Sequence, residues 1–372
     1  MKVGILGGGQ LGRMLLQQSA NFVVETYVLE NDEHCPAAHL CHHFTKGSIR
    51  DFDTVYNFGK HLDAITIEIE DVNIEALEKL ESEGVKIYPK AAALKIIKSK
   101  ILQKQFYVSN EIPSPEFIIA QNKNDVIVNN HFLPAVHKLA EGGYDGKGVE
   151  ILKEENDFER AFDAPSVLEK MVKIKKEIAI IVAMSDAGET VTFPAAEMHA
   201  DPVLNLLDYQ LSPAILPEKL LWKSEAIALA VLNGLKSPGL FAVELFIDFD
   251  DNVWVNETAP RVHNSGHHTI ECNVTSQFEQ HLRSILNLPL GSTEIIQHGA
   301  MINLLGAEGH QGPVYYKGLE KLMTYKGVHV HSYGKALTKP YRKMGHVTIV
   351  NEDVNEARKI AEQVKNTIRV IS

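Results

Sequence analysis

The sequence predicts an α/β protein of two or three domains. Strands and helices alternate along the first 95 residues, which is typical of a parallel sheet with helices on its faces. The chain has 372 residues, of which 45% are hydrophobic, so it can bury more than one core. Residues 288–291 resemble a linker before a smaller unit. We expect domains at 1–97, 98–290 and 291–372, with α+β character in the central one.

The expected elements follow from apolar periodicity and from turn residues between the periodic runs. In the first unit we expect strands at 3–6, 22–29, 64–69 and 85–88, and helices at 13–20 and 73–83. The central unit should contain a helical run at 91–108, strands at 132–138, 149–152, 166–172 and 177–183, and helices at 224–234 and 275–286. The last unit should contain strands at 301–305, 329–333 and 345–350 and a closing helix at 354–367.

A predicted hairpin carries two acidic residues on one face. Glu244 lies in the apolar run 240–247, Glu257 ends the run 253–257, and residues 248–252 form the turn. If Asp250 and Asp251 are the two loop residues, Glu244 lies opposite Glu257. Opposed residues have Cβ atoms about 4.5–5.5 Å apart, so the carboxylates repel unless a cation or a shared proton lies between them.

Composition excludes several classes of protein. The formal net charge is −11, which argues against a nonspecific binder of nucleic acid or of anionic membranes. No apolar run reaches the roughly 18 residues of a membrane-spanning helix, and the N-terminus lacks a signal-peptide pattern. Cys35, Cys41 and Cys272 have neither zinc-site nor disulfide spacing, so we expect a reduced, cytoplasmic protein.

The segment Gly7–Gly12 matches the G-x-G-x-x-G pattern between a strand and a helix. Glu30 follows the second strand, where a dinucleotide-binding fold places its ribose-binding acid. An NAD-dependent oxidoreductase is therefore one hypothesis. A phosphorylated substrate at the helix N-terminus, or a tight turn with no ligand, would suit the same residues.

Two further segments have residues that suit phosphate binding. Residues 142–148 hold four glycines and a lysine, so their backbone can fold over phosphates, with Lys138 four residues upstream. The order of residues is not that of a P-loop, and an ordinary hairpin loop is the alternative. The run from Lys335 to Arg342 is basic in an acidic protein, which indicates either a phosphate clamp or a solvated loop.

Four motifs in this order resemble the N5-carboxyaminoimidazole ribonucleotide synthetase family. They are Gly-Gly-Gly-Gln-Leu-Gly-Arg-Met at 7–14, Gly-Gly-Tyr-Asp-Gly-Lys-Gly at 142–148, Asn-Glu-Thr-Ala-Pro-Arg-Val-His-Asn-Ser-Gly-His at 256–267 and Arg-Lys-Met-Gly-His at 342–346. The resemblance implies an ATP-grasp fold with an N-terminal Rossmann-like domain and a small C-terminal domain. It also implies ATP- and bicarbonate-dependent carboxylation of 5-aminoimidazole ribonucleotide through carboxyphosphate, with Mg²⁺, in a homodimer.

The resemblance also implies site residues. Lys100 and Lys138 would bind the nucleotide phosphates, and residues 143–149 would cover them. Residues 169–172 would form a hinge that binds the adenine, and Glu177 would bind the ribose. The implied nucleotide-binding residues are Lys100, Lys138, Gly143, Tyr144, Asp145, Gly146, Lys147, Gly148, Val149, Glu169, Lys170, Met171, Val172, Glu177, His199, Val255 and Asn256. Glu244 and Glu257 are implied as magnesium ligands, and the implied catalytic residues are Asp145, Lys147, Arg261 and His263.

The ribonucleotide site would combine residues from all three domains. The implied substrate-binding residues are Gly9, Gln10, Leu11, Glu68, Tyr144, Arg261, His263, Asn264, Ser265, Lys335 and Arg342, with Glu70 beside Glu68. Two features depart from the family pattern. Lys100 stands where some relatives have arginine, and the segment Pro194–His199 is one residue shorter than usual, which puts the role of His199 in question.

Alternatives of other classes stay open on the sequence. Another ATP-grasp enzyme, such as a formate-dependent glycinamide ribonucleotide transformylase, would share the nucleotide site. An oxidoreductase would rest on the first glycine motif alone. The pair Glu244 and Glu257 speaks against the oxidoreductase, and the full set of charged groups speaks against a nucleotide-binding module without turnover.

Overall fold

The computed structural model describes residues 1–142, 148–200 and 207–372. The N-terminal unit is a parallel sheet in the order β3-β2-β1-β4-β5, as the alternating pattern predicts. Its strands are β1 (Lys2–Leu6), β2 (Glu25–Glu30), β3 (His43–Lys46), β4 (Ala64–Ile67) and β5 (Lys86–Tyr88). Its helices are α1 (Gln10–Ser19), α2 (Phe52–Gly59) and α3 (Ile74–Ser82). Helix α1 begins three residues before the expected start, because the glycine turn leads directly into it with Gly9 as the N-cap.

The predicted helical run at 91–108 is two helices, α4 (Ala91–Lys98) and α5 (Lys100–Ser109). The break is at Ser99, whose backbone is extended (φ −104°, ψ 118°) and whose hydroxyl accepts a hydrogen bond from the Leu102 amide. Serine at this position competes for the backbone and caps the new helix, which the apolar periodicity alone does not reveal. Lys100 is the first residue after the break, and its ammonium group pairs with Glu257 on strand β15 (Val253–Ala259).

A small antiparallel sheet forms one lobe of the central domain, in the order β6-β9-β7-β8. Its strands are β6 (Phe117–Ala120), β9 (Ser166–Lys170), β7 (Ala135–Leu139) and β8 (Val149–Leu152). Helix α6 (Lys123–Val128) and two short 3₁₀ turns cover it, around a core that includes Phe132 and Phe158. Strand β7 starts three residues later than expected, because Phe132 belongs to a 3₁₀ turn. The described glycines at the ends of the loop, Gly142 and Gly148, have φ values of +80° and +78°.

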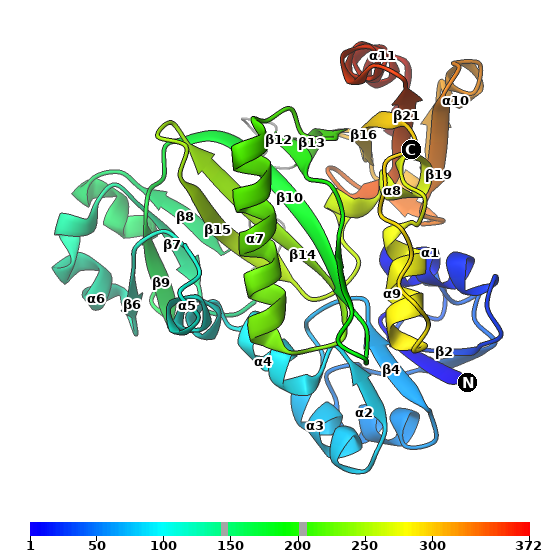
Figure 1. Cartoon of the computed structure of the whole chain (residues 1–372), viewed down its shortest axis with the longest axis horizontal. Coiled ribbons are helices and arrows are strands. Elements are labelled where there is room, and N and C mark those ends of the chain that lie inside the picture. The colour runs from blue at the N-terminus through cyan, green and yellow to red at the C-terminus, as the bar shows by residue number, and fades with distance from the viewer. Residues whose placement is uncertain (143–147, 201–206) are drawn as a thin grey trace.

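A larger sheet forms the second lobe, in the order β15-β14-β10-β12-β13-β16-β21-β19. Its strands are β10 (Ile174–Met184), β12 (Ala196–Ala200), β13 (Leu207–Ser212), β14 (Gly239–Asp248), β15 (Val253–Ala259), β16 (His298–Leu305), β19 (Val328–Ser332) and β21 (Lys343–Asn351), with β11 (Thr190–Thr192) paired to β10. Helix α7 (Glu218–Leu235) covers one face (Figure 1). Helix α9 (Gln277–Ile285) packs on the other face and against α1, which joins the N-terminal unit to this sheet.

The C-terminal region continues the large sheet. Strand β16 pairs with β13 of the central domain, so main-chain hydrogen bonds cross the expected limit at residues 290 and 291. Helix α11 (Val354–Thr367) covers β16 and β21 and has the bounds that the sequence predicts. The remaining elements are short: α8 (Thr269–Cys272), α10 (Leu319–Leu322), β17 (Gly312–Pro313) with β20 (Leu337–Thr338), and β18 (Tyr315–Lys317) with β22 (Arg369–Ile371). The three domain limits stay predictions.

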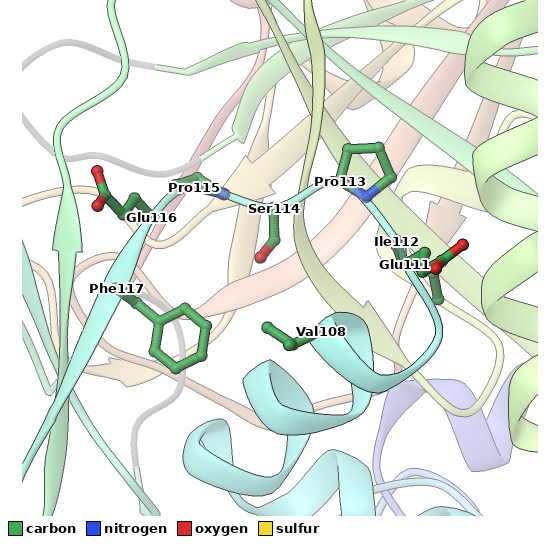
Figure 2. Close-up of a pocket in the computed structure, with 8 residues that line it drawn as sticks. All are labelled: Val108, Glu111, Ile112, Pro113, Ser114, Pro115, Glu116 and Phe117. Atoms are coloured by element: carbon green, nitrogen blue, oxygen red, sulfur yellow. The ribbon is translucent and has the colours of Figure 1, made fainter.

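An extended segment, residues 112–117, connects α5 to the small lobe (Figure 2). The Pro113 carbonyl accepts a hydrogen bond from Val255 of the large lobe (2.8 Å), and the Glu116 carbonyl accepts one from Lys170 of the small lobe (2.8 Å). The segment therefore binds both lobes of the central domain. It also lines a cavity of about 330 Å³ that none of the predicted site residues reaches. Within the described ranges, no helix is long and apolar enough to cross a membrane.

Candidate active site

The predicted carboxylate pair is present. Glu244 on β14 lies directly opposite Glu257 on β15. The loop is not the expected two-residue loop, because Asp248 pairs with Asn252 and Asp251 adopts a left-handed conformation with φ +59°. That turn alone would pair Glu244 with Asn256. A β-bulge between the pairs Leu245–Val255 and Glu244–Glu257 inserts Asn256 as an extra residue and places the two glutamates opposite each other.

The pair lies on the sheet face opposite α7. Val243 and Leu245 pack into the core beneath α7, so alternation places Glu244 on the other face together with Glu177 of β10. Burial raises the pKa of Glu244, and the negative charges of Glu257 and Glu177 raise it further. The ammonium of Lys100, in contact with the Glu257 carboxylate, holds the pKa of Glu257 low. These are the expected properties of a site arranged to bind a cation.

A buried carboxylate between two lysines lies beside this pair. Glu169, 3% exposed, is 3.1 Å from Lys138 Nζ and 3.3 Å from Lys104 Nζ. Lys138 also donates to Asn256 Oδ1 at 3.0 Å, so the bulge residue holds the predicted phosphate-binding lysine. Burial lowers the pKa of Lys104 to about 8, and the neighbouring charge of Lys138 acts in the same direction. The cluster has one more positive than negative charge when all three groups are ionised, which suits an incoming phosphate.

The predicted adenine hinge at 169–172 is partly occupied by protein contacts. The Lys170 amide donates to Glu116, and the Met171 amide donates to the Pro134 carbonyl at 3.2 Å. An adenine would therefore have to bind at Val172 or at carbonyl groups of the hinge. Glu177 lies on the site face, and burial raises its pKa.

Two predicted nucleotide contacts lie away from the site face. The His199 ring stacks on Tyr209 (4.3 Å between centroids) and contacts Glu197 at 3.2 Å, on the α7 side of the sheet by alternation. Val255 is fully buried in the core under α7, which leaves its side chain no surface for a nucleotide. Strand alternation therefore turns both side chains away from the site face, and the nucleotide contacts assigned to His199 and Val255 stay predictions.

The loop after β15 carries two of the predicted catalytic residues, Arg261 and His263. Arg261 Nε is 2.9 Å from Glu70 Oε1, so the guanidinium meets the N-terminal domain. His263 Nδ1 is 2.9 Å from Ser265 Oγ and 3.8 Å from Glu244 Oε1. Ser265 and Asn264 are both buried, with exposed fractions of 1% and 8%. The Ser265 hydroxyl orients the His263 imidazole, and this geometry does not support the expected contact of Ser265 with the substrate.

The glycine turn at 7–12 surrounds a carboxylate of the protein itself. Glu68 accepts hydrogen bonds from the Gly9 amide and from the Leu11 amide (3.3 Å) at the start of α1. A Cβ on Gly9 would lie 2.2 Å from Glu68 Oε1, so glycine is needed for the approach. Glu30 accepts from the Gly8 amide at 3.1 Å. The helix N-terminus that a dinucleotide phosphate would use is thus already paired with an anion, which weakens the oxidoreductase hypothesis.

Basic residues from distant parts of the chain meet at the same turn. Lys335 Nζ donates to Gln10 Oε1 (2.6 Å) and to the Lys343 carbonyl (2.7 Å). Arg13 of α1 lies next to Gly334, the residue before Lys335. Arg342 donates to the Leu337 carbonyl at 2.7 Å and lies at the rim. The predicted substrate residues Gln10 and Lys335 are therefore brought together although 325 positions separate them.

Comparison with protein-family models finds three matches in order. Residues 1–98 match the ribonucleotide synthetase preATP-grasp domain, residues 105–278 the ATP-grasp domain, and residues 299–360 the phosphoribosylaminoimidazole carboxylase C-terminal domain. The crystal structure of N5-carboxyaminoimidazole ribonucleotide synthetase from Thermotoga maritima is 39% identical, with a TM-score of 0.93, covering 100% of this chain and 99% of that one. The chain belongs to the N5-carboxyaminoimidazole ribonucleotide synthase family.

Other synthase relatives agree. The N5-carboxyaminoimidazole ribonucleotide synthase of Synechococcus elongatus is 35% identical over 93% of this chain and 89% of its own length. A structure from Aspergillus clavatus, solved with ADP and 5-aminoimidazole ribonucleotide, has a TM-score of 0.89 at 30% identity and covers 98% of both chains. The chain spans 64% of the length of a chloroplastic phosphoribosylaminoimidazole carboxylase from Vigna aconitifolia, to which it is 38% identical over 95% of its own residues. The predicted family, fold class and ligase class are confirmed.

The synthase site contains residues that the sequence analysis missed. Lys104 was within reach of a pattern, since it follows Lys100 by four residues and so shares its helix face. Arg13 and Lys343 lie inside two of the family motifs, but only tertiary packing shows that Arg13 and the Lys343 carbonyl meet the segment around Lys335. The loop residues Gly143, Tyr144, Asp145, Gly146 and Lys147 lie outside the described residues. Gly148 and Val149 are described: the Gly148 carbonyl accepts from Leu139, and Val149 pairs with Lys138.

The residues present fit a magnesium ion held together with a nucleotide. Among the described residues, no three His, Cys, Asp or Glu side chains converge to hold a metal without help. Glu244 and Glu257 supply two facing carboxylates, one with a raised pKa, and Mg²⁺ bound by one or two carboxylates usually completes its shell with phosphates and water. The two carboxylates therefore suit Mg²⁺, and its binding stays a prediction.

Proposed function

We propose that this chain carboxylates the amine of 5-aminoimidazole ribonucleotide, using ATP and bicarbonate and releasing ADP and phosphate. A bicarbonate oxygen attacks the γ-phosphorus of ATP, the bond to the β-phosphate oxygen breaks, and carboxyphosphate forms. The ribonucleotide amine then attacks the carboxyl carbon, phosphate leaves, and the amine proton passes to a base. The observation that carries the proposal is the Glu244–Glu257 pair next to the Lys104–Glu169–Lys138 cluster, to which Asn256 links it through Lys138.

We assign the phosphate end of ATP to Lys100 and Lys138. Phosphoryl transfer requires mainly positioning and neutralisation of charge, which these two lysines, at the start of α5 and on β7, supply. Both are held by carboxylates before a nucleotide binds, Lys100 by Glu257 and Lys138 by Glu169. Glu244 and Glu257 would hold Mg²⁺, which neutralises phosphate charge when bound.

The ribonucleotide is assigned to the surface between the glycine turn and the basic residues. Lys335 provides a charged donor for its phosphate and Gln10 a polar contact. Arg261 pairs with Glu70, and its positive charge also lowers the pKa of Glu68, the carboxylate held by the glycine turn. We infer that Arg261 stabilises the carboxyl-bearing anion and that His263, beside Glu244, orients the reacting groups.

The test is a coupled ADP-release assay with 5-aminoimidazole ribonucleotide, run with and without bicarbonate. We expect ADP to be released only when both 5-aminoimidazole ribonucleotide and bicarbonate are present. Formate-dependent release would instead identify a transformylase, and ATP binding without turnover would identify a binding module.

Within this assay, Glu257→Gln should reduce bicarbonate-dependent ADP release at least about 100-fold, because one facing carboxylate is lost. The control Glu78→Gln, at an exposed pair with Lys95, should be unchanged. Full activity in Glu257→Gln would contradict the assignment of this residue as a metal ligand.

The homodimer, the cytoplasmic location and the domain limits at 97 and 290 are part of the same proposal. Their support is the family resemblance. Light scattering of the purified chain tests the first, since a monomeric mass at micromolar concentration would contradict it.

A further inference from the structure

A buried glutamine holds the loop that carries His263. Gln277 is the first residue of α9 and its side chain is fully buried. Its Oε1 accepts a hydrogen bond from the His263 amide (2.9 Å), and its Nε2 donates to the His263 carbonyl (2.7 Å). The orientation of the side-chain amide follows from these partners, because a backbone N–H can only donate and a carbonyl can only accept.

The loop is shaped around this side chain. A Cβ on Gly266 would lie 2.3 Å from Gln277 Oε1, so only glycine leaves room for the amide. Thr269 Oγ1 donates to the Gly266 carbonyl (2.6 Å) and accepts from the Gln277 backbone amide (2.8 Å). The start of α9 is thus joined to the loop twice, through the side chain of Gln277 and, by way of Thr269, through its backbone amide.

A stack of histidine rings supports the glutamine from behind. His267 Nδ1 lies 3.2 Å from Gln277 Nε2 and so accepts from it. The His267 ring stacks on His346 of β21 (4.6 Å), which stacks on His331 of β19 (4.4 Å). Burial lowers the pKa of His267 and of His346 well below the usual value, so both rings are neutral. The stack joins the His263 loop to β21, the strand that begins at Lys343.

We propose that Gln277 is a positioning residue for carboxylation, which fixes the His263 backbone so that the imidazole stays at Ser265 and beside Glu244. This inference rests on the proposed function, because it requires a role for His263. Two hydrogen bonds to the amide and the carbonyl of one residue restrict both displacement and rotation of that residue. Gln277 itself is buried behind the loop and does not touch the substrate.

The test is Gln277→Met, which keeps the length and burial of the side chain but removes its two hydrogen bonds with His263 and the one to His267. We expect kcat to fall about 10- to 100-fold, since a displacement of about 1 Å can cost about 100-fold, with KM for ATP within about twofold of the wild type. The matched control is Gln280→Met. Gln280 is equally buried one turn along α9, and its Oε1 accepts from Gly291, outside the loop (2.9 Å).

Gln277→Met loses more hydrogen bonds than Gln280→Met, so thermal unfolding is measured for both variants and kcat is measured well below both midpoints, where loss of folded enzyme cannot account for a difference in kcat. Unchanged kcat in Gln277→Met, or an equal loss in Gln280→Met, would overturn the positioning role. A double-mutant cycle with His263→Asn, followed by single-turnover ADP formation, gives a second readout. Gln277→Met should have little further effect in the His263→Asn background, and full additivity would overturn the inference.

The wild-type assay separates the two proposals. Absence of bicarbonate- and ribonucleotide-dependent ADP release in the wild type would overturn the proposed function and, with it, this role. Wild-type activity together with full kcat in Gln277→Met would overturn the positioning role alone.

Discussion

At the scale of single residues, the site depends on groups that are paired with one another before any substrate binds. Glu169 is shared by Lys104 and Lys138, and Glu257 is paired with Lys100. Buried charges of this kind are tolerated only when they are paired, since isolated charges lose too much hydration. An arriving phosphate can therefore take over Lys138 while Lys104 continues to neutralise Glu169.

Removing Lys104 tests this arrangement. In Lys104→Met, Glu169 keeps its ion pair with Lys138 but loses the one with Lys104. Lys138 must then neutralise Glu169 and is less available to the nucleotide. We expect KM for ATP to rise about tenfold and the free energy of unfolding to fall by about 1–3 kcal/mol. The ADP-release assay and urea denaturation measure the two effects. The control Lys95→Met removes an exposed ion pair with Glu78. It should leave KM for ATP unchanged and alter the free energy of unfolding by no more than about 0.5 kcal/mol.

At the scale of elements, short irregularities place the functional groups. The β-bulge at Asn256 opposes the two glutamates, the helix break at Ser99 delivers Lys100, and the glycine turn before α1 encloses Glu68. Bulges and caps change where a strand or helix presents its side chains without changing the element type. Site geometry here is therefore set by the ends and interruptions of the elements.

Gly9→Ala tests the glycine turn. The added Cβ would meet Glu68 Oε1 at 2.2 Å and displace the carboxylate from the start of α1. We expect KM for the ribonucleotide to rise more than about tenfold while KM for ATP stays within about twofold, because the nucleotide phosphates bind on the other side of the site. Steady-state kinetics with each substrate varied in turn measure this, and an equal rise in both constants would contradict the assignment.

At the scale of the whole molecule, shared sheets and cores join the three regions. The large sheet continues from the central domain into the C-terminal region through β13 and β16. One core cluster combines Val3 and Leu15 of the N-terminal unit with Ile181, Ala242 and Leu282. Because a sheet and a core cluster cross the limits between the regions, we expect a loss of stability in one region to affect its neighbours.

Glu197 provides the pH-dependent prediction. Burial raises its pKa, but hydrogen bonds from His199 and Lys176 outweigh this and lower it to about 2. A lowered folded-state pKa stabilises the protein above the unfolded value of about 4.5, and this stabilisation is lost as the pH falls toward 2. Glu197→Gln should cost on the order of 2–3 kcal/mol at pH 7 and much less near pH 2. Urea denaturation across this range measures it, and a pH-independent cost would contradict the linkage.

The sequence alone determined the fold class, the family and most elements. Strand and helix identity follows from local periodicity, and the closing helix at 354–367 was placed without error for this reason. The residues also pointed to Glu244, Glu257 and Lys138, whereas Lys100 was implied by the family resemblance, and the metal- and phosphate-binding roles of all four stay predictions. The register of the carboxylate pair was predicted from a wrong turn, which the unforeseen bulge at Asn256 compensated.

Only the tertiary structure decided which groups face one another. It turned the side chains of His199 and Val255 away from the site face and buried Gln277 against His263. It also placed the Glu68 carboxylate at the N-terminus of α1, where the oxidoreductase hypothesis would place a dinucleotide phosphate. The physical reason is that these contacts join residues far apart in the chain, whose meeting depends on packing, strand alternation and bulges. Local sequence patterns specify the elements, and the close packing of those elements selects the partners.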